Sequence, residues 1–437
     1  MIYDVRNYGA VGDGVAADGQ SIQKAINAAG EAGGGRVVLP AGTWRSGMLT
    51  LRDHVDLHLH TGAVLLAADD VEAYDDVDHR RDAHRPLQAM LFADRAEHIA
   101  ITGTGVIDGG GGPQPLDWQA ARELALRPVV LLWRDCRHVR ICDLTIRHAQ
   151  NWTLHLKRCE HVRISGVTMQ NNWPNSDGID PDGCRHVVIS DCDITAGDDC
   201  IVLKSTEGDP CENVVVNNCI LRTNCAALKL GTESIGPIRN VVVNGCVALG
   251  VPEEGGTGVG FGLYMKDGGT FENIVCSNLV VHNGSQFPIL IDITPRFAVA
   301  GEAGEGCEAA DPSGDADLHA APGRIRRVRF ENCIVCSPGR LHIEGTAACP
   351  VEEVAIRGLQ WHATGPLVTD VFKPAGAARV SHDPDRINHA ATAHLISAAH
   401  VQGLSLHDVG LTWADGIEPD RELLYTHDVK DLRNHST

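Results

Sequence analysis

Residues 175–205 read NSDGIDPDGCRHVVISDCDITAGDDCIVLKS. This stretch includes the following acids: Asp177, Asp180, Asp182, Asp198 and Asp199. Both of its ends are short apolar runs interrupted by Gly and Asp. Carboxylates at strand edges and about twenty residues apart meet only if the chain coils back on itself once. The stretch therefore predicts a solenoid, in which each coil lies against the next.

A short β-run led by His or Asn recurs along the chain. It starts at His138, His161, His186, Asn213, Asn240 and Asn273, with separations of 23, 25, 27, 27 and 33 residues. Inward Val or Ile alternates with outward polar residues, and Gly, Asn and Asp fill the turns, which is typical of stacked parallel strands. Such a repeat cannot bury its apolar face alone, so its coils must stack. We predict an all-β parallel β-helix, with the leading histidines as turn or ladder residues rather than metal ligands.

The two ends of the chain read differently from the repeats. Residues 18–29 read as one amphipathic helix, which would cap the open N-terminal end of the coil. Residues 298–323, rich in Ala, Gly, Glu and Asp, are expected to be a long surface loop. We predict a single β-helix domain over 1–437. Its parts are the N-terminal cap and first coils at 1–50, the coils carrying the site at 51–360, and C-terminal coils, cap and tail at 361–437.

The composition limits the partners and the compartment. The formal net charge of −20 argues against nucleic acid or an anionic membrane as a partner. The chain has no apolar run long enough for a transmembrane helix and no visible secretory signal. Its 15 cysteines are an odd number and are expected to be reduced and buried, which favours a cytoplasmic protein. A trimmed signal would instead be compatible with secretion, and the oligomeric state is left open.

Three acids of the opening stretch point to a reaction. Asp177, Asp198 and Asp199 would lie on neighbouring coils, where three carboxylates cannot all ionise without cost, so one of them is expected to hold a proton. Paired carboxylates of this kind cleave glycosidic bonds. The alternative is that these acids form turns or bind calcium. Two consecutive acids directly before an apolar strand are an unusual sequence for a turn, so we favour the catalytic interpretation.

Several motifs, taken in order, resemble the polygalacturonase-like glycoside hydrolases of family 28. They are DVRNYGAVGDG at 4–14, GTGVIDG at 103–109, NWTLH at 151–155, NSDGID at 175–180 and GDDC at 197–200. The resemblance covers roughly residues 2–360 and implies a right-handed parallel β-helix. It also implies hydrolysis with inversion, with Asp198 as the general acid and with Asp177 and Asp199 activating the attacking water. Neither a cofactor nor a metal is expected.

The chain departs from the pattern of this family at two places. The family's Gly-His-Gly segment falls near residues 224–227, where this chain has no histidine. His155 and His282 are the candidates to replace it. The family's Arg-Ile-Lys segment aligns with Tyr264-Met265-Lys266, which keeps the lysine and loses the arginine. Arginine grips a carboxylate with two hydrogen bonds in a way that lysine does not, so the expectation of polygalacturonate is weakened.

The substrate is expected to bind around these acids. The candidate binding residues are Asn175, Lys204, Lys229, Glu233, Tyr264, Lys266 and Trp173. Tyr264 is suited to stack on a sugar face, and Trp173 is suited to form a wall of the cleft. Asn175 would orient the neighbouring acid or bind a sugar hydroxyl. Lys204 would either pair with a carboxylate or contact the substrate.

The sequence thus predicts a glycoside hydrolase that cleaves a pectin-like or related oligosaccharide. Because no export signal is visible, trimming of imported oligosaccharides from one end is favoured over depolymerisation. The alternative is a β-helix sugar enzyme that does not hydrolyse: a polysaccharide lyase, an epimerase or a glycosyl transferase. A lyase would need Arg or Lys as a base and calcium-binding acids, and the missing arginine argues against it. A relative that only binds sugar would not need three crowded acids.

Overall fold

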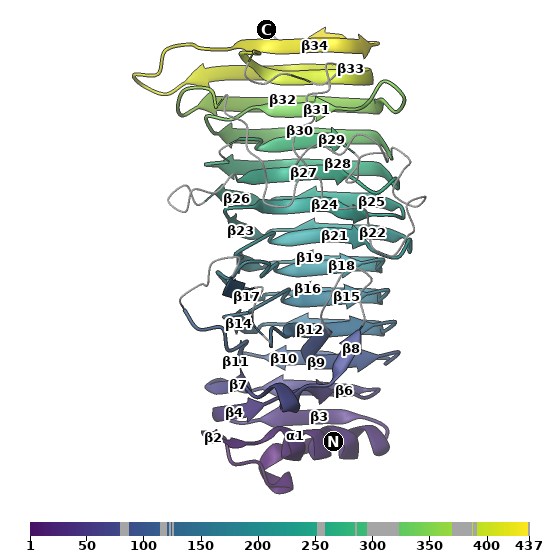
Figure 1. Ribbon diagram of the computed structural model, residues 1–437, viewed down its shortest axis with the longest axis vertical. Coiled ribbons are helices and arrows are strands. Elements are labelled where there is room, and N and C mark those ends of the chain that lie inside the picture. The colour runs from purple at the N-terminus through teal and green to yellow at the C-terminus, as the bar shows by residue number, and fades with distance from the viewer. Residues whose placement is uncertain are drawn as a thin grey trace. The chain divides into compact units, whose positions relative to one another are not determined.

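The computed structural model describes residues 1–78, 87–113, 120–121, 124, 126–250, 258–284, 286–294, 323–368, 387 and 391–435. Its contacts divide the chain into unit 1, Met1–Cys200, and unit 2, Ile201–Thr437. Each unit consists of parallel strands stacked coil on coil (Figure 1), so the predicted all-β parallel β-helix is confirmed. The loop predicted at 298–323 lies outside the described residues up to position 322. Among the described residues, no helix is long and apolar enough to cross a membrane.

The strands of unit 1 form three parallel sheets, in which each strand pairs with those of the neighbouring coils. The first sheet contains β1 (Ile2–Asp4), β3 (Gly35–Leu39), β6 (Val55–Leu59), β10 (Ala100–Gly103), β13 (Arg137–Cys142), β16 (Glu160–Ser165) and β19 (Arg185–Ser190). The second contains β2 (Asp13–Ala17), β4 (Gly42–Ser46), β7 (Ala63–Ala67), β11 (Val106–Asp108), β14 (Thr145–Arg147), β17 (Thr168–Gln170) and β20 (Asp193–Thr195). The third contains β5 (Leu49–Thr50), β9 (Leu87–Asp94), β12 (Val129–Arg134), β15 (Leu154–Lys157) and β18 (Ile179–Asp182), and β8 (Asp76–Asp78) pairs antiparallel with β9.

Unit 2 repeats this arrangement, and its strand β33, with 20 residues, runs through all three sheets. Its third sheet contains β21 (Ile201–Ser205), β24 (Ala226–Ser234), β27 (Val259–Met265), β29 (Ile289–Ile293), β31 (Leu341–Glu344), the start of β33 (His394–Trp413) and β34 (Glu422–Lys430). The first sheet contains β22 (Cys211–Asn217), β25 (Ile238–Asn244), parts of β28 (Thr270–His282), β30 (Arg324–Cys336), β32 (Val351–Ala363) and β33, and β35 (Arg433–His435). The second contains β23 (Ile220–Thr223), β26 (Val247–Gly250) and the ends of β28, β30, β32 and β33.

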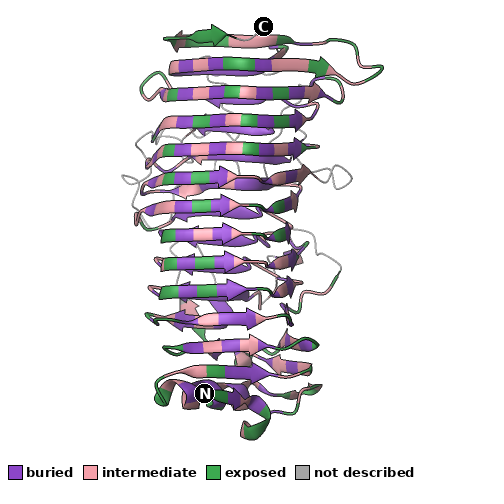
Figure 2. Cartoon of the chain, turned by 180° about the vertical axis from the view of Figure 1, so that it is seen from behind, coloured by how far each residue is buried: buried purple, intermediate pink, exposed green. Residues whose placement is uncertain are grey.

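Equivalent residues of successive coils form columns inside each unit. Val139, Val162 and Val187 are register partners in the first sheet of unit 1, and all three are buried. Val214 and Val241 are matching partners in unit 2. Buried and exposed residues alternate along these strands (Figure 2). Burial of one such side chain contributes about 1.5–3 kcal/mol, and the stacked columns make up the core.

The residues that lead the repeats form ladders at the turns. His138, His161 and His186 have φ angles of 55°, 56° and 56°, a left-handed conformation that His and Asn tolerate better than most residues. Their rings stack, with centroids 4.9 Å and then 5.0 Å apart. In unit 2, Asn240 Nδ2 donates to Asn213 Oδ1 at 3.0 Å. The structure thus places these residues in ladders, as the repeat pattern predicts.

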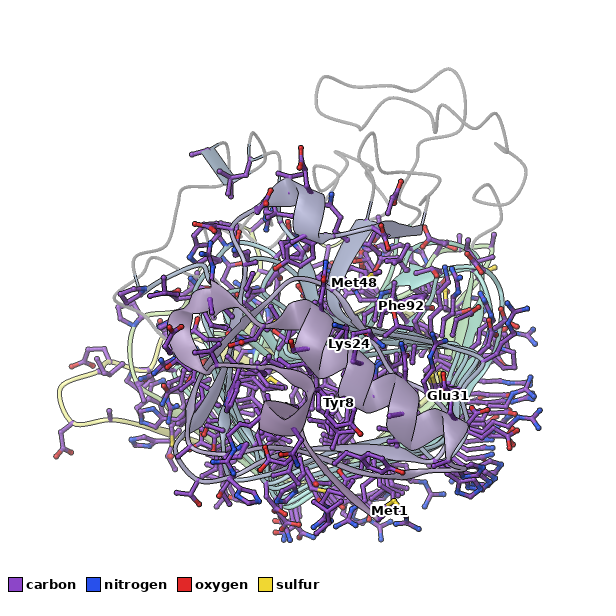
Figure 3. The ribbon with its side chains drawn as sticks, turned by 90° about the horizontal axis from the view of Figure 1, so that it is seen from below. Met1, Tyr8, Lys24, Glu31, Met48 and Phe92 are labelled. Carbon is purple, nitrogen blue, oxygen red and sulfur yellow. The ribbon has the colours of Figure 1, made fainter. Side chains whose placement is uncertain are left out.

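One helix covers the N-terminal end of unit 1. The helix α1 (Gly19–Glu31) matches the helix predicted over 18–29, and it buries Ile22 and Ile26 against the first coils. Figure 3, seen from below, shows α1 lying across the end of the coils, with Lys24 and Glu31 labelled. The helix therefore covers strand edges that would otherwise be open to pairing with another chain.

Candidate active site

Two turns on neighbouring coils of unit 1 carry the predicted catalytic acids. Gly178 N donates to Asp199 O at 2.9 Å, and Ile179 N donates to Cys200 O at 2.9 Å. On the other side of the same turn, Thr153 N donates to Asp177 O at 2.8 Å. Because strand pairing here is parallel and in register, Asp177 and the Asp198–Asp199 pair are held on adjacent coils at the same edge.

Two glycines allow these turns to approach each other closely. A Cβ atom on Gly178 would lie 2.3 Å from Cys200 O, and a Cβ atom on Gly197 would lie 2.3 Å from Trp173 O. Real Cβ atoms essentially never come within 3.0 Å of another heavy atom in this way. Any side chain at either position would therefore force the two turns apart.

The three acids differ in exposure. Asp177 is 3% exposed and Asp199 is 1% exposed, whereas Asp198 is half-buried. One carboxylate oxygen of Asp198 and one of Asp199 lie within 4.8 Å of each other. At this separation two negative charges repel each other. The half-buried Asp198 is the acid of the three that solvent or a bound ligand reaches more readily.

A serine that the sequence analysis did not single out joins the two turns. Ser176 Oγ donates to Trp173 O at 2.6 Å and accepts from Gly197 N at 3.1 Å. Trp173, predicted to form a wall of the cleft, is only 6% exposed. Asn175 has a φ of 56°, a left-handed backbone conformation that Asn tolerates better than most residues. The only sequence signal for Ser176 is its place between Asn175 and Asp177.

The outward face of the third sheet of unit 1 holds further buried acids. Asp180 and Asp182 are two residues apart on β18, so both point to the same side. His155 on β15 is the register partner of Asp180, and its Nε2 lies 3.2 Å from Asp182 Oδ2. All three side chains are buried. His155, one of the two candidates for the missing histidine, is therefore held beside a carboxylate.

The remaining predicted binding residues lie in unit 2 and form two clusters. Lys204 is 3% exposed, and its Nζ lies 2.9 Å from Glu233 Oε2. Of the two roles expected for Lys204, pairing with a carboxylate and contact with the substrate, the structure shows the first. In the second cluster, Lys229 Nζ and Lys266 Nζ lie 5.2 Å and 5.9 Å from the centre of the Tyr264 ring. Both ammonium groups are thus within the range of a cation–π interaction with this half-buried ring.

Known proteins resemble this chain in sequence and in fold. The family model "Glycosyl hydrolases family 28" matches residues 58–294. A probable polygalacturonase of Vitis vinifera is 33% identical over 215 residues, which are 46% of this chain and 43% of that protein. An exo-poly-alpha-D-galacturonosidase of Dickeya chrysanthemi is 26% identical over 250 residues, 46% of this chain and 41% of that protein.

The solved structure of the Yersinia enterocolitica family 28 exopolygalacturonase has a TM-score of 0.74 and 18% identity, and the match covers 98% of this chain and 78% of that one. At this identity the likeness shows the fold. The matches to the two curated relatives span less than half of the length of either. The family model, in contrast, spans more than half of this chain. The chain belongs to glycosyl hydrolases family 28.

Proposed function

We propose that this chain is a pectin-degrading glycoside hydrolase that inverts the anomeric centre and removes galacturonate units from the end of an oligosaccharide. The observation that carries the proposal is the pairing of two turns in unit 1, which holds Asp177 beside Asp198 and Asp199. Family membership supports the reaction class, and the polygalacturonase relatives support the substrate class.

The exposures of the three acids suggest how they divide the work. Asp198, half-buried, is the general acid that protonates the oxygen of the leaving sugar. Asp177 and Asp199, both buried, hold the attacking water and accept its proton. Inverting enzymes commonly hold the acid and the base about 6.5–9.5 Å apart, which leaves room for the water on the opposite face of the sugar ring. The oxygens of Asp198 and Asp199 that lie within 4.8 Å of each other are closer than this range, so Asp177 is the proposed base on the far side of the water.

The cluster around Tyr264 is the proposed recognition element for an acidic sugar. The face of the Tyr264 ring offers a surface for the apolar face of a sugar ring, and the ammonium groups of Lys229 and Lys266 lie beside it, that of Lys266 paired with Asp292. In this arrangement two point charges replace the bidentate grip of the family's arginine. The exo mode of action is supported by the Dickeya chrysanthemi relative, which is named as an exo-acting enzyme.

The test is Asp198→Asn, with defined oligogalacturonides as substrates and NMR observation of the first product anomer. Loss of a general acid should lower kcat by about 10²–10⁴-fold and leave sugar binding nearly unchanged. Asp193→Asn is the matched control, because Asp193 is an exposed acid of the same unit and should tolerate the change.

Three results would contradict parts of this proposal. Full turnover by Asp198→Asn would remove the assignment of the acid. A first product with retained configuration would exclude inversion, and an unsaturated product would replace the hydrolase with a lyase. Products released from the interior of a long substrate would replace exo with endo action.

A further inference from the structure

Three metal-ligating side chains converge on the third sheet of unit 2. Strands β29 and β31 pair in parallel, with Asp292 opposite Glu344 and Leu290 opposite His342. His342 and Glu344 are two residues apart, so they and Asp292 lie on the same face of the sheet. Asp292, His342 and Glu344 are 7%, 4% and 2% exposed. A buried imidazole with two buried carboxylates is a costly arrangement unless each charge is compensated.

The distances inside this triad are too long for direct hydrogen bonds of charged groups. His342 Nε2 lies 3.7 Å from Asp292 Oδ1 and 3.4 Å from Glu344 Oε2. A charge-assisted hydrogen bond between such groups measures about 2.7–2.9 Å. In a tetrahedral zinc site, bonds of about 2.0–2.1 Å place neighbouring ligand atoms about 3.3–3.4 Å apart. The two distances from His342 are therefore close to those between zinc ligands, and the three ligand atoms all lie within 4.8 Å of one another.

Neighbouring groups orient both carboxylates. Asp292 Oδ2 lies 2.5 Å from Lys266 Nζ, and Thr294 Oγ1 lies 2.7 Å from Oδ2 and 2.9 Å from Oδ1. Glu344 Oε1 accepts a hydrogen bond from Ile387 N at 2.7 Å. Neighbouring groups thus hold both carboxylates in place, and Asp292 Oδ1 and Glu344 Oε2 are the oxygens that lie near His342 Nε2. Anchoring of ligand side chains by outer groups is a general property of protein metal sites.

We propose that Asp292, His342 and Glu344 bind one divalent transition-metal ion, with Zn²⁺ as the best fit to the donor set of one imidazole nitrogen and two carboxylate oxygens. The two carboxylates and the Lys266 ammonium carry a net charge of −1, which a divalent cation more than offsets. The ion would join β29 to β31 and fix the carboxylate that holds Lys266. The proposal does not depend on the proposed hydrolase function, since no step of catalysis passes through this site.

The test is titration of the chelator-treated protein with Zn²⁺ by calorimetry, together with the visible spectrum after loading with Co²⁺. Glu344→Gln is the decisive variant, because the Gln side chain keeps Oε1 for Ile387 N and replaces only the ligand oxygen Oε2. His155→Gln is the matched control, since His155 is also a buried imidazole beside a carboxylate. We expect one Zn²⁺ per chain for the unmodified protein and the control, and a Kd at least 100-fold weaker for Glu344→Gln.

Two outcomes would overturn this inference. Equal Zn²⁺ affinity in the unmodified protein and Glu344→Gln would assign binding to other histidines, such as those of the exposed ladder. Absence of tight Zn²⁺ binding would show that the triad is not a metal site. If Glu344→Gln does not fold, the spectrum of the Co²⁺-loaded unmodified protein decides: a weak octahedral spectrum refutes a site with these three ligands, and an intense tetrahedral one supports it.

Discussion

Gly178→Ala should separate the two turns that carry the proposed catalytic acids. The new Cβ atom would start 2.3 Å from Cys200 O and must move about 0.7 Å to reach 3.0 Å, the closest approach that real Cβ atoms show. Overpacking of this kind costs about 1–3 kcal/mol of stability. A displacement close to 1 Å at a reacting centre lowers the rate by about 10²-fold. We expect kcat to fall about 10–100-fold, because Asp177 moves relative to Asp199.

The measurement is kcat on a defined oligogalacturonide, with the free energy of unfolding from urea titration alongside it. Gly365→Ala is the control, because its Cβ atom would meet Pro338 Cβ at 3.4 Å, an ordinary contact. The control should stay within about 0.5 kcal/mol of the unmodified stability and keep its kcat. A folded Gly178→Ala protein with unchanged kcat would refute the reasoning, since the spacing of the two turns would then not matter for catalysis.

Three further predictions concern pH, thiol reactivity and substrate affinity. A hydrogen bond from Arg158 lowers the pKa of Asp135. The ionised carboxylate therefore stabilises the fold above its unfolded pKa of about 3.9, and this stabilisation is lost as the pH falls through the lower folded pKa. The free energy of unfolding of Asp135→Asn, measured in urea, should fall less on acidification than that of the unmodified protein. Burial raises the pKa of Cys333 to about 11, so little of its thiol is present as the reactive thiolate. When the native protein is treated with maleimide, mass spectrometry should find the label on the half-buried Cys336 and not on Cys333. Tyr264→Ala should raise KM more than it lowers kcat, and Tyr264→Phe should restore most of the affinity; equal effects of both variants would exclude ring stacking.

Much of the fold follows from residues at the turns. The runs led by His138, His161 and Asn213 could be predicted as strand starts because each leading residue takes a positive φ that few side chains tolerate. Alternating Val and Ile then specify the inward face of the following strand. The capping helix was predictable from its apolar spacing, and its bounds agree with α1 to within a few residues.

The C-terminal coils were harder to predict, although they continue the same architecture. The long strand β33 buries Val401, Leu404 and Leu406 in the columns of the earlier coils. Small residues and histidines between these positions weaken the apolar alternation on which the repeat was identified. Pairing with a preceding coil supplies backbone hydrogen bonds whatever the outward side chains are, so a coil can persist where its sequence pattern fades.

The lateral contacts of the site could not be read from one sequence. The acids Asp177 and Asp198 were identifiable from their motifs. The hydrogen bond from Gly197 N to Ser176 Oγ was not, because it joins residues of neighbouring turns that are distant in the sequence. The sequence allowed two roles for Lys204. Its ion pair with Glu233 depends on which residue of the next coil lies opposite Lys204. Coil length varies along the chain, so the opposite residue is known only once the register is known.

In the third sheets, the alternation of apolar and polar residues underestimates how many polar side chains are buried. In the first sheet of unit 1, β13 and β19 have inward residues buried and several outward residues exposed, as alternation predicts. In the third sheets, every residue of β15, β18 and β31 is buried, polar outward ones included. Sequences such as IDPD and LHIE would be expected to expose their acids to solvent. Polar groups that stay buried need compensating partners, and retaining them has a free-energy cost, which points to a role in binding or catalysis. Burial on both faces, rather than any single motif, therefore distinguishes these strands of the third sheet, where the buried acids of both proposed sites lie or begin.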